Sequence, residues 1–126
     1  MPLDHIGLNV PDVPAALAYY DELFGLFGYV RDWEVGYRPA DWQGAQVFVY
    51  PALEDGEHSR LTTGLSHLCF HVHTRAEVDR VHEWAVGRGH EVLHAPREFP
   101  EYGAHFATYF LDVHHFMIEA FTHAEA

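Results

Sequence analysis

The fold is decided by the octet Leu3-Asp4-His5-Ile6-Gly7-Leu8-Asn9-Val10. A second octet repeats it at a constant offset (67 − 5 = 62), and its sequence is Leu65-Ser66-His67-Leu68-Cys69-Phe70-His71-Val72. The leucine, the histidine and the valine are identical in the two octets, and apolar residues alternate with other residues along each of them. Alternation with a period of two is typical of a strand with one buried face. We therefore expect two equivalent strands, each with a histidine on its less apolar face.

Each octet is followed by the signals of a helix and then of about three strands. Asp12 is a candidate N-cap for the first helix, and Thr74-Arg75-Ala76-Glu77 is typical of a capping box at the start of the second. Glycines mark the end of both helical patterns. Strand-forming stretches follow at residues 28–33, 37–39 and 46–50 in the first half and at 91–94, 106–111 and 116–121 in the second.

The expected fold class is therefore α+β, with two tandem βαβββ modules in one domain. Module one spans residues 1–51, a polar linker spans 52–64, and module two spans 65–123. A chain of 126 residues that is 48% hydrophobic can bury a proper core. The single cysteine, Cys69, cannot form an internal disulfide, and we expect it to lie in the core.

The amino-acid composition limits the possible binding partners and the expected cellular location of the protein. The chain has 19 acidic and 7 basic residues, a formal net charge of −12, and no lysine. Nucleic acid and anionic membranes are poor partners, because binding them needs clustered cations. No apolar run approaches the roughly 20 residues of a membrane helix, and the first residues do not resemble a signal peptide. These features predict a soluble, cytoplasmic protein.

The repeated unit, with a histidine on the first strand of each module and a glutamate on the last strand, resembles the vicinal oxygen chelate superfamily. Three motifs carry the resemblance over nearly the whole chain: 4–10, 64–70, and 109–112 followed by Phe116-Met117-Ile118-Glu119. The superfamily includes glyoxalases, extradiol dioxygenases, fosfomycin-resistance proteins and bleomycin-binding proteins. The resemblance implies cup-shaped mixed sheets. One departure is Asp112-Val113-His114-His115, where relatives usually have Asp-Pro-Asp-Gly; histidine tolerates left-handed geometry, so we expect the hairpin to survive.

The resemblance also implies a metal site formed by His5, His67 and Glu119. Two imidazoles and a carboxylate bind divalent first-row metals such as Fe, Mn, Ni or Zn and leave positions open for a substrate with adjacent oxygens. Strand parity places Glu119 with Met117 and Phe121 on the cavity side of an otherwise apolar strand, where a carboxylate is costly without a cation or a metal. The alternative interpretation is that both histidines are hydrogen-bonded core residues and that Glu119 is solvated at a strand end.

A fourth ligand and further pocket residues are weaker predictions. Gln46 could ligate the metal through its amide oxygen, although the strand register more naturally places Phe48 at that position. His71, Tyr109 and Tyr102 are candidates for a general acid or base near the metal. For each of them, ordinary packing in a small β-rich domain is the competing explanation.

The expected function is that of a metal-dependent enzyme, either dioxygenase-like or lyase/isomerase-like, acting on a small molecule with two neighbouring oxygens. The alternative is a non-catalytic protein that binds a cationic drug, as the bleomycin-binding members do, since an acidic chain with aromatic pocket walls suits such a ligand. Members of the superfamily commonly pair their modules between two chains. The resemblance therefore implies a homodimer.

Overall fold

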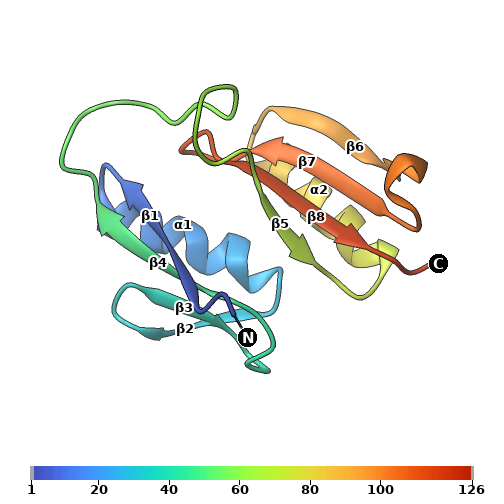
Figure 1. The fold of residues 1–126 in the computed structure, drawn as a ribbon, viewed down its shortest axis with the longest axis horizontal. Helices are drawn as coiled ribbons and strands as arrows, with labels where there is room; N and C mark the ends of the chain where they lie inside the picture. Colours follow the sequence, from blue (N-terminus) through green and yellow to red (C-terminus); the bar gives the residue numbers. More distant parts are fainter. Residues whose placement is uncertain (1, 126) are drawn as a thin grey trace. The chain divides into compact units, whose positions relative to one another are not determined.

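The computed structural model describes residues 2–125, which form eight strands, two α-helices and one 3-10 turn. The chain divides into two compact units, one ending at Gly56 and one beginning at Glu57. The division falls inside the segment 52–64 that the sequence predicts as a linker. Each unit contains one four-stranded mixed sheet and one α-helix (Figure 1). Among residues 2–125, none of the helices has the length and apolar character that crossing a membrane requires.

The first unit is a βαβββ module. It consists of β1 (His5–Val10), α1 (Val13–Gly25), β2 (Tyr29–Trp33), β3 (Gly36–Pro39) and β4 (Gln46–Pro51). The strand order is β1-β4-β3-β2, with β1 parallel to β4 and the other neighbours antiparallel. Helix α1 begins at the predicted cap, where the Asp12 side chain accepts a hydrogen bond from the Ala15 N–H.

The second unit repeats this plan. It consists of β5 (Leu68–His71), α2 (Arg75–Gly87), β6 (Val92–Glu98), the 3-10 turn η1 (Pro100–Tyr102), β7 (Phe106–Leu111) and β8 (Met117–Thr122). The strand order is β5-β8-β7-β6, again with a parallel pair formed by the first and last strands. Thr74 caps α2 as predicted, because its hydroxyl oxygen accepts a hydrogen bond from the Glu77 N–H. The predicted α+β fold of two βαβββ modules is confirmed.

In each unit the helix packs against one face of the sheet, and the core lies between them. Alternate residues of β1 and β4, such as Leu8, Val10, Val47 and Val49, are buried on the helix side. Burying a side chain of this size stabilises the fold by about 1.5–3 kcal/mol. The opposite face of each sheet, which carries His5 in the first unit and Glu119 in the second, is called the open face below. The two strand histidines lie on these open faces.

Candidate metal centre

Glu119 is the least expected side chain in the second unit, because it is a carboxylate with only 2% of its surface exposed. Its neighbours in β8, Ile118 and Ala120, are buried on the helix side, so Glu119 belongs to the open face. Removing an ionised carboxylate from water costs several kcal/mol unless other groups replace the lost hydration. The surroundings of Glu119 must therefore supply donors.

Four side chains surround the Glu119 carboxylate. His105 Nε2 lies 2.6 Å from Oε2, and His67 Nε2 lies 3.3 Å from Oε1. The Tyr109 hydroxyl and the Cys69 thiol also hydrogen-bond to Glu119. The strand register explains this gathering, since Cys69 of β5 and Tyr109 of β7 are the direct neighbours of Glu119 on either side. Residues far apart in sequence thus converge on one buried charge.

The carboxylate keeps its two strand neighbours protonated. Burial, the negative charge of Glu119 and a hydrogen bond to it raise the pKa of the Cys69 thiol well above its ordinary value. Burial and the same carboxylate raise the pKa of the Tyr109 hydroxyl. Both groups therefore remain hydrogen-bond donors at neutral pH. Although its thiol is partly desolvated beside Glu119, the residue as a whole lies on the open face and is exposed, so the prediction that Cys69 belongs to the core is wrong.

The positions of His67 and Glu119 suit a shared metal ion. Two ligand atoms that each lie about 2.0–2.2 Å from one ion, at tetrahedral to octahedral angles, are about 2.8–3.6 Å apart. The 3.3 Å between His67 Nε2 and Glu119 Oε1 falls in this range. The other ring nitrogen of His67, Nδ1, lies 3.0 Å from the Ser66 hydroxyl oxygen. A partner on the second ring nitrogen is the usual support of a metal-binding histidine.

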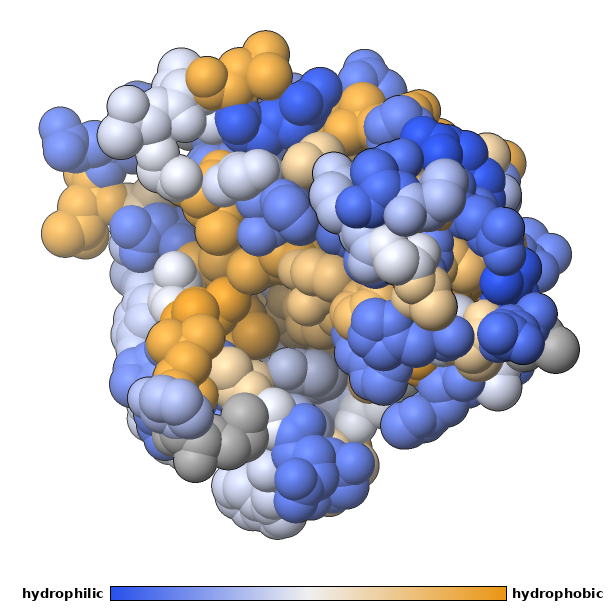
Figure 2. Space-filling view, turned by 45° about the vertical axis from the view of Figure 1, so that its right-hand side comes forward, coloured by the Kyte–Doolittle hydropathy of each residue, from blue (hydrophilic) through white to orange (hydrophobic). Residues whose placement is uncertain are grey.

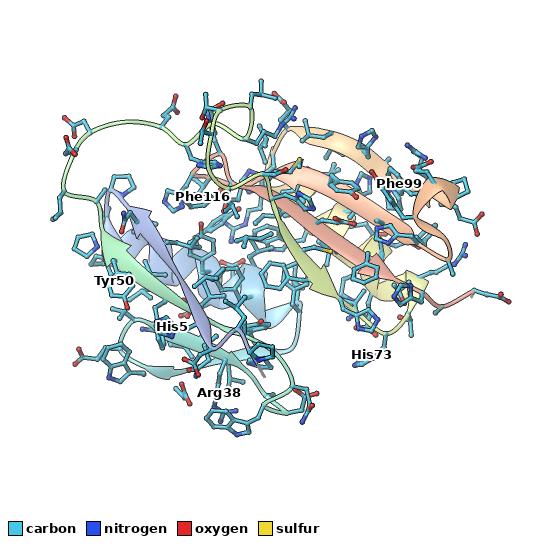
Figure 3. The ribbon with its side chains drawn as sticks, viewed as in Figure 1. His5, Arg38, Tyr50, His73, Phe99 and Phe116 are labelled. Atoms are coloured by element: carbon cyan, nitrogen blue, oxygen red, sulfur yellow. The ribbon has the colours of Figure 1, made fainter. Side chains whose placement is uncertain are left out.

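His5 has the same arrangement in the first unit. Its Nδ1 lies 2.7 Å from a carboxylate oxygen of Asp4, which can only accept, so Nδ1 carries the proton and Nε2 carries the lone pair. His5 lies at the start of β1 (Figure 3). In both units, therefore, the side chain of the residue before the strand histidine contacts the Nδ1 atom of that histidine.

The strand registers also locate the position in the first unit that corresponds to Glu119. Glu119 pairs with Cys69, and the residue equivalent to Cys69 is Gly7 (69 − 62 = 7), which pairs with Phe48. Phe48 is therefore the counterpart of Glu119, while Gln46 pairs with His5. The Phe48 ring lies 4.7 Å from the His5 ring, centroid to centroid. An aromatic ring thus occupies the place where a fourth carboxylate or amide ligand would lie.

The remaining predicted residues lie at different distances from this centre. Tyr109 is part of it. Tyr102 lies on η1, is exposed, and contacts the ring of His105 at the edge of the centre. His71 lies farther along β5, with its ring against those of His73, His123 and Phe121. Burial, together with the neighbouring His123 and His73, lowers the pKa of His71.

His105 is the residue that sequence reasoning missed. It precedes β7 and shares the parity of Ala107 and Tyr109, so continuing the period-two pattern of β7 by one residue would have found it. Within residues 2–125, no group of three or more His, Cys, Asp or Glu side chains is arranged to hold a metal ion. The participation of His5 with His67 and Glu119 stays a prediction.

These observations define a small α+β protein with a repeated βαβββ unit and a histidine–carboxylate centre on an open sheet face. The sequence model of the glyoxalase/bleomycin resistance protein/dioxygenase superfamily matches residues 4–109 of this chain. The chain therefore belongs to this superfamily. The match includes His5 and His67 and ends before Glu119.

One protein of similar sequence and two solved structures of similar fold illustrate what the chain is similar to. The chain is 27% identical to the uncharacterized protein YqjT of Bacillus subtilis strain 168 over 126 residues, which cover 93% of this chain and 95% of that protein. A glyoxalase/dioxygenase from Nostoc punctiforme has a similar fold, with a TM-score of 0.75, 23% identity, and coverage of 98% of this chain and 91% of that one. The fosfomycin resistance protein FosX of Listeria monocytogenes has a TM-score of 0.68 at 21% identity, with coverage of 95% and 91%.

Proposed function

We propose that this protein is a metal-dependent enzyme that binds a divalent first-row metal ion through His5, His67 and Glu119. The observation that supports this most directly is the 3.3 Å separation of His67 Nε2 from Glu119 Oε1 at the centre of an open sheet face. Superfamily membership supports it as well, since the resemblance implies divalent metals. Gln46 is left out of the proposed ligand set because Phe48 is the counterpart of Glu119.

The proposed substrate is a small molecule with two neighbouring oxygens, and the reaction is dioxygenase-like or lyase/isomerase-like. His5, His67 and Glu119 would hold the ion, and the chemistry it would supply there is Lewis-acid polarisation of substrate oxygens. Tyr109, whose pKa is raised by burial and by Glu119, is the proposed general acid or base next to the bound substrate. His71 and Tyr102 lie farther from Glu119, so we propose for them contacts with the outer part of the substrate.

Metal content tests the proposal directly. The protein should be purified without chelator, and its metal measured by elemental analysis beside His5→Ala, His67→Ala and Glu119→Ala. We expect about one ion per chain in the wild type and its loss in all three variants. His73→Ala, which removes an exposed histidine outside the proposed ligand set, is the matched control and should keep the metal. A wild type without metal, even after incubation with Fe²⁺, Mn²⁺, Ni²⁺ and Zn²⁺, would contradict the proposal.

A binding protein for cationic drugs is the second candidate. The observations that favour it are the net charge of −12 and two largely exposed tryptophans in the first unit, Trp33 and Trp42. Arg38 already lies over the Trp42 ring, 4.0 Å from its centroid, which leaves Trp33 as the better platform. Titration of the metal-free protein with bleomycin separates the two functions, because a sequestering pocket would bind the drug without a metal.

A further inference from the structure

The two oxygens of Glu119 have different partners. His105 Nε2 lies 2.6 Å from Oε2, whereas His67 Nε2 lies 3.3 Å from Oε1. An ionised carboxylate can only accept hydrogen bonds, so the short contact requires that His105 Nε2 carries a proton and donates it. A nitrogen that donates to Oε2 has no lone pair for a metal.

The surroundings of His105 hold its ring in this orientation. The ring stacks on Phe121 with 4.6 Å between centroids and an interplanar angle of 15°. Tyr102 of the turn η1 and Phe99, which precedes this turn and is labelled in Figure 3, contact the ring edge-on. The backbone is fixed as well, because the His105 carbonyl accepts a 2.7 Å hydrogen bond from the Phe99 N–H. With 13% of its side chain exposed, His105 has little freedom to turn toward an ion beside Oε1.

We infer that His105 is a positioning residue that reserves Oε2 of Glu119 and makes this carboxylate a ligand through Oε1 alone. The inference rests on the proposed metal-binding function and specifies how one ligand is used. A carboxylate that binds through both oxygens occupies one more coordination position than a carboxylate that binds through one. By holding Oε2, His105 keeps that position open for a substrate that chelates through two neighbouring oxygens.

The test compares variants that remove or keep the N–H donor. His105→Phe keeps an aromatic ring against Phe121 but has no donor, while the amide of His105→Gln can still donate to Oε2. His94→Phe is the control, because it makes the same change at a histidine whose ring contacts the rings of Phe99 and Tyr109. Each full-length protein is titrated with Zn²⁺ by calorimetry, and the visible spectrum of its Co²⁺ form is recorded.

We expect His105→Phe to bind the same number of ions as the wild type with an affinity about 10- to 100-fold lower, the usual effect of losing a partner of a metal ligand. His105→Gln should recover most of the affinity, and His94→Phe should match the wild type. The Co²⁺ spectrum should change in His105→Phe, because a released carboxylate can bind through both oxygens. Should His105→Phe not fold, His105→Leu provides the variant without a donor.

The outcomes separate this inference from the proposed function. A wild type that binds no metal overturns the proposed function, and this inference with it. Wild-type binding that is unchanged in His105→Phe overturns the inference alone. Loss of the ion from His105→Phe, to the same extent as from His67→Ala, also overturns it, because His105 would then be a ligand.

Discussion

Glu119 shows how one residue can organise a site. Its burial would be costly in isolation, yet His67, His105, Tyr109 and Cys69 all direct donors or ring nitrogens toward it. The same contacts that compensate the charge also fix the position of each oxygen. A carboxylate held in this way would need little reorganisation to serve as the proposed metal ligand.

Among the single residues around Glu119, the sequence predicted some and missed others, and each outcome has a physical reason. His67 could be found because it repeats His5 at the constant offset of 62, and Glu119 because it is an acidic residue in an otherwise apolar strand. Cys69 was assigned to the core because cysteine is usually buried, whereas strand parity places it beside Glu119 on the open face. His105 lies just outside β7, so a pattern limited to the strand did not include it.

Gln46 provides a test at the scale of single residues. Gln46→Ala should bind metal with the wild-type stoichiometry and with an affinity within about threefold of the wild type. The reason is that Gln46 lies outside the proposed ligand set, so its replacement removes no bond to the metal. His5→Ala, which changes the partner of Gln46 in the strand register, should lose the ion. Calorimetric titration of both variants with Zn²⁺ measures this. Loss of the ion from Gln46→Ala would mean that four side chains hold the metal.

The turn between β7 and β8 is the element that sets the position of Glu119. Its sequence lacks the proline and glycine of relatives, and His115 adopts a left-handed conformation with φ 66°, as expected for a histidine in this turn. Asp112 completes the turn, since one of its oxygens accepts hydrogen bonds from the N–H groups of His114 and Phe116. Met117, the first residue of β8, follows directly.

Asp112 is therefore expected to stabilise the fold through the turn between β7 and β8. Asp112→Ala should lower the free energy of unfolding by about 1–3 kcal/mol, because Asp112 is 2% exposed and its loss leaves two backbone donors without their partner. Asp112→Asn keeps an acceptor oxygen and should lose less. Urea unfolding followed by circular dichroism measures both. Equal stability of the alanine variant and the wild type would show that another group satisfies these donors.

Strand β6 is longer than its local sequence pattern predicts. The sequence predicted a strand at residues 91–94, but β6 runs to Glu98 and includes Pro96. A proline cannot donate to a sheet, so it ordinarily argues against a strand. The strand order places β6 at the edge, and its register shifts between His94 and Arg97, which are the conditions under which a strand accepts proline. Both conditions depend on tertiary structure.

For the whole molecule, the repeated βαβββ unit was predictable because each copy carries its own periodic pattern and its own helix cap. The number of chains in the functional protein has no such local pattern. The homodimer implied by the resemblance stays a prediction. Large exposed aromatic side chains, Trp33 with 56% and Trp42 with 60% of their surface exposed, are typical of surfaces that pair.

Light scattering during size-exclusion chromatography tests the dimer. We expect a mass twice that of the 14.4 kDa chain. Trp33→Asp should shift the protein toward the monomer, because it places a charge on an exposed aromatic surface. Leu53→Asp changes a more exposed residue, 94% accessible, and should leave the mass unchanged. A wild-type mass of one chain would contradict the prediction.

The central claim is that one metal ion lies between His67 and Glu119, and anomalous diffraction at the metal absorption edge tests it most directly. Crystals grown with Zn²⁺ should show an anomalous peak about 2.0–2.2 Å from both His67 Nε2 and Glu119 Oε1, with His105 Nε2 still bonded to Oε2. A map with no peak at this position, at a metal concentration that saturates the protein in solution, would contradict the account.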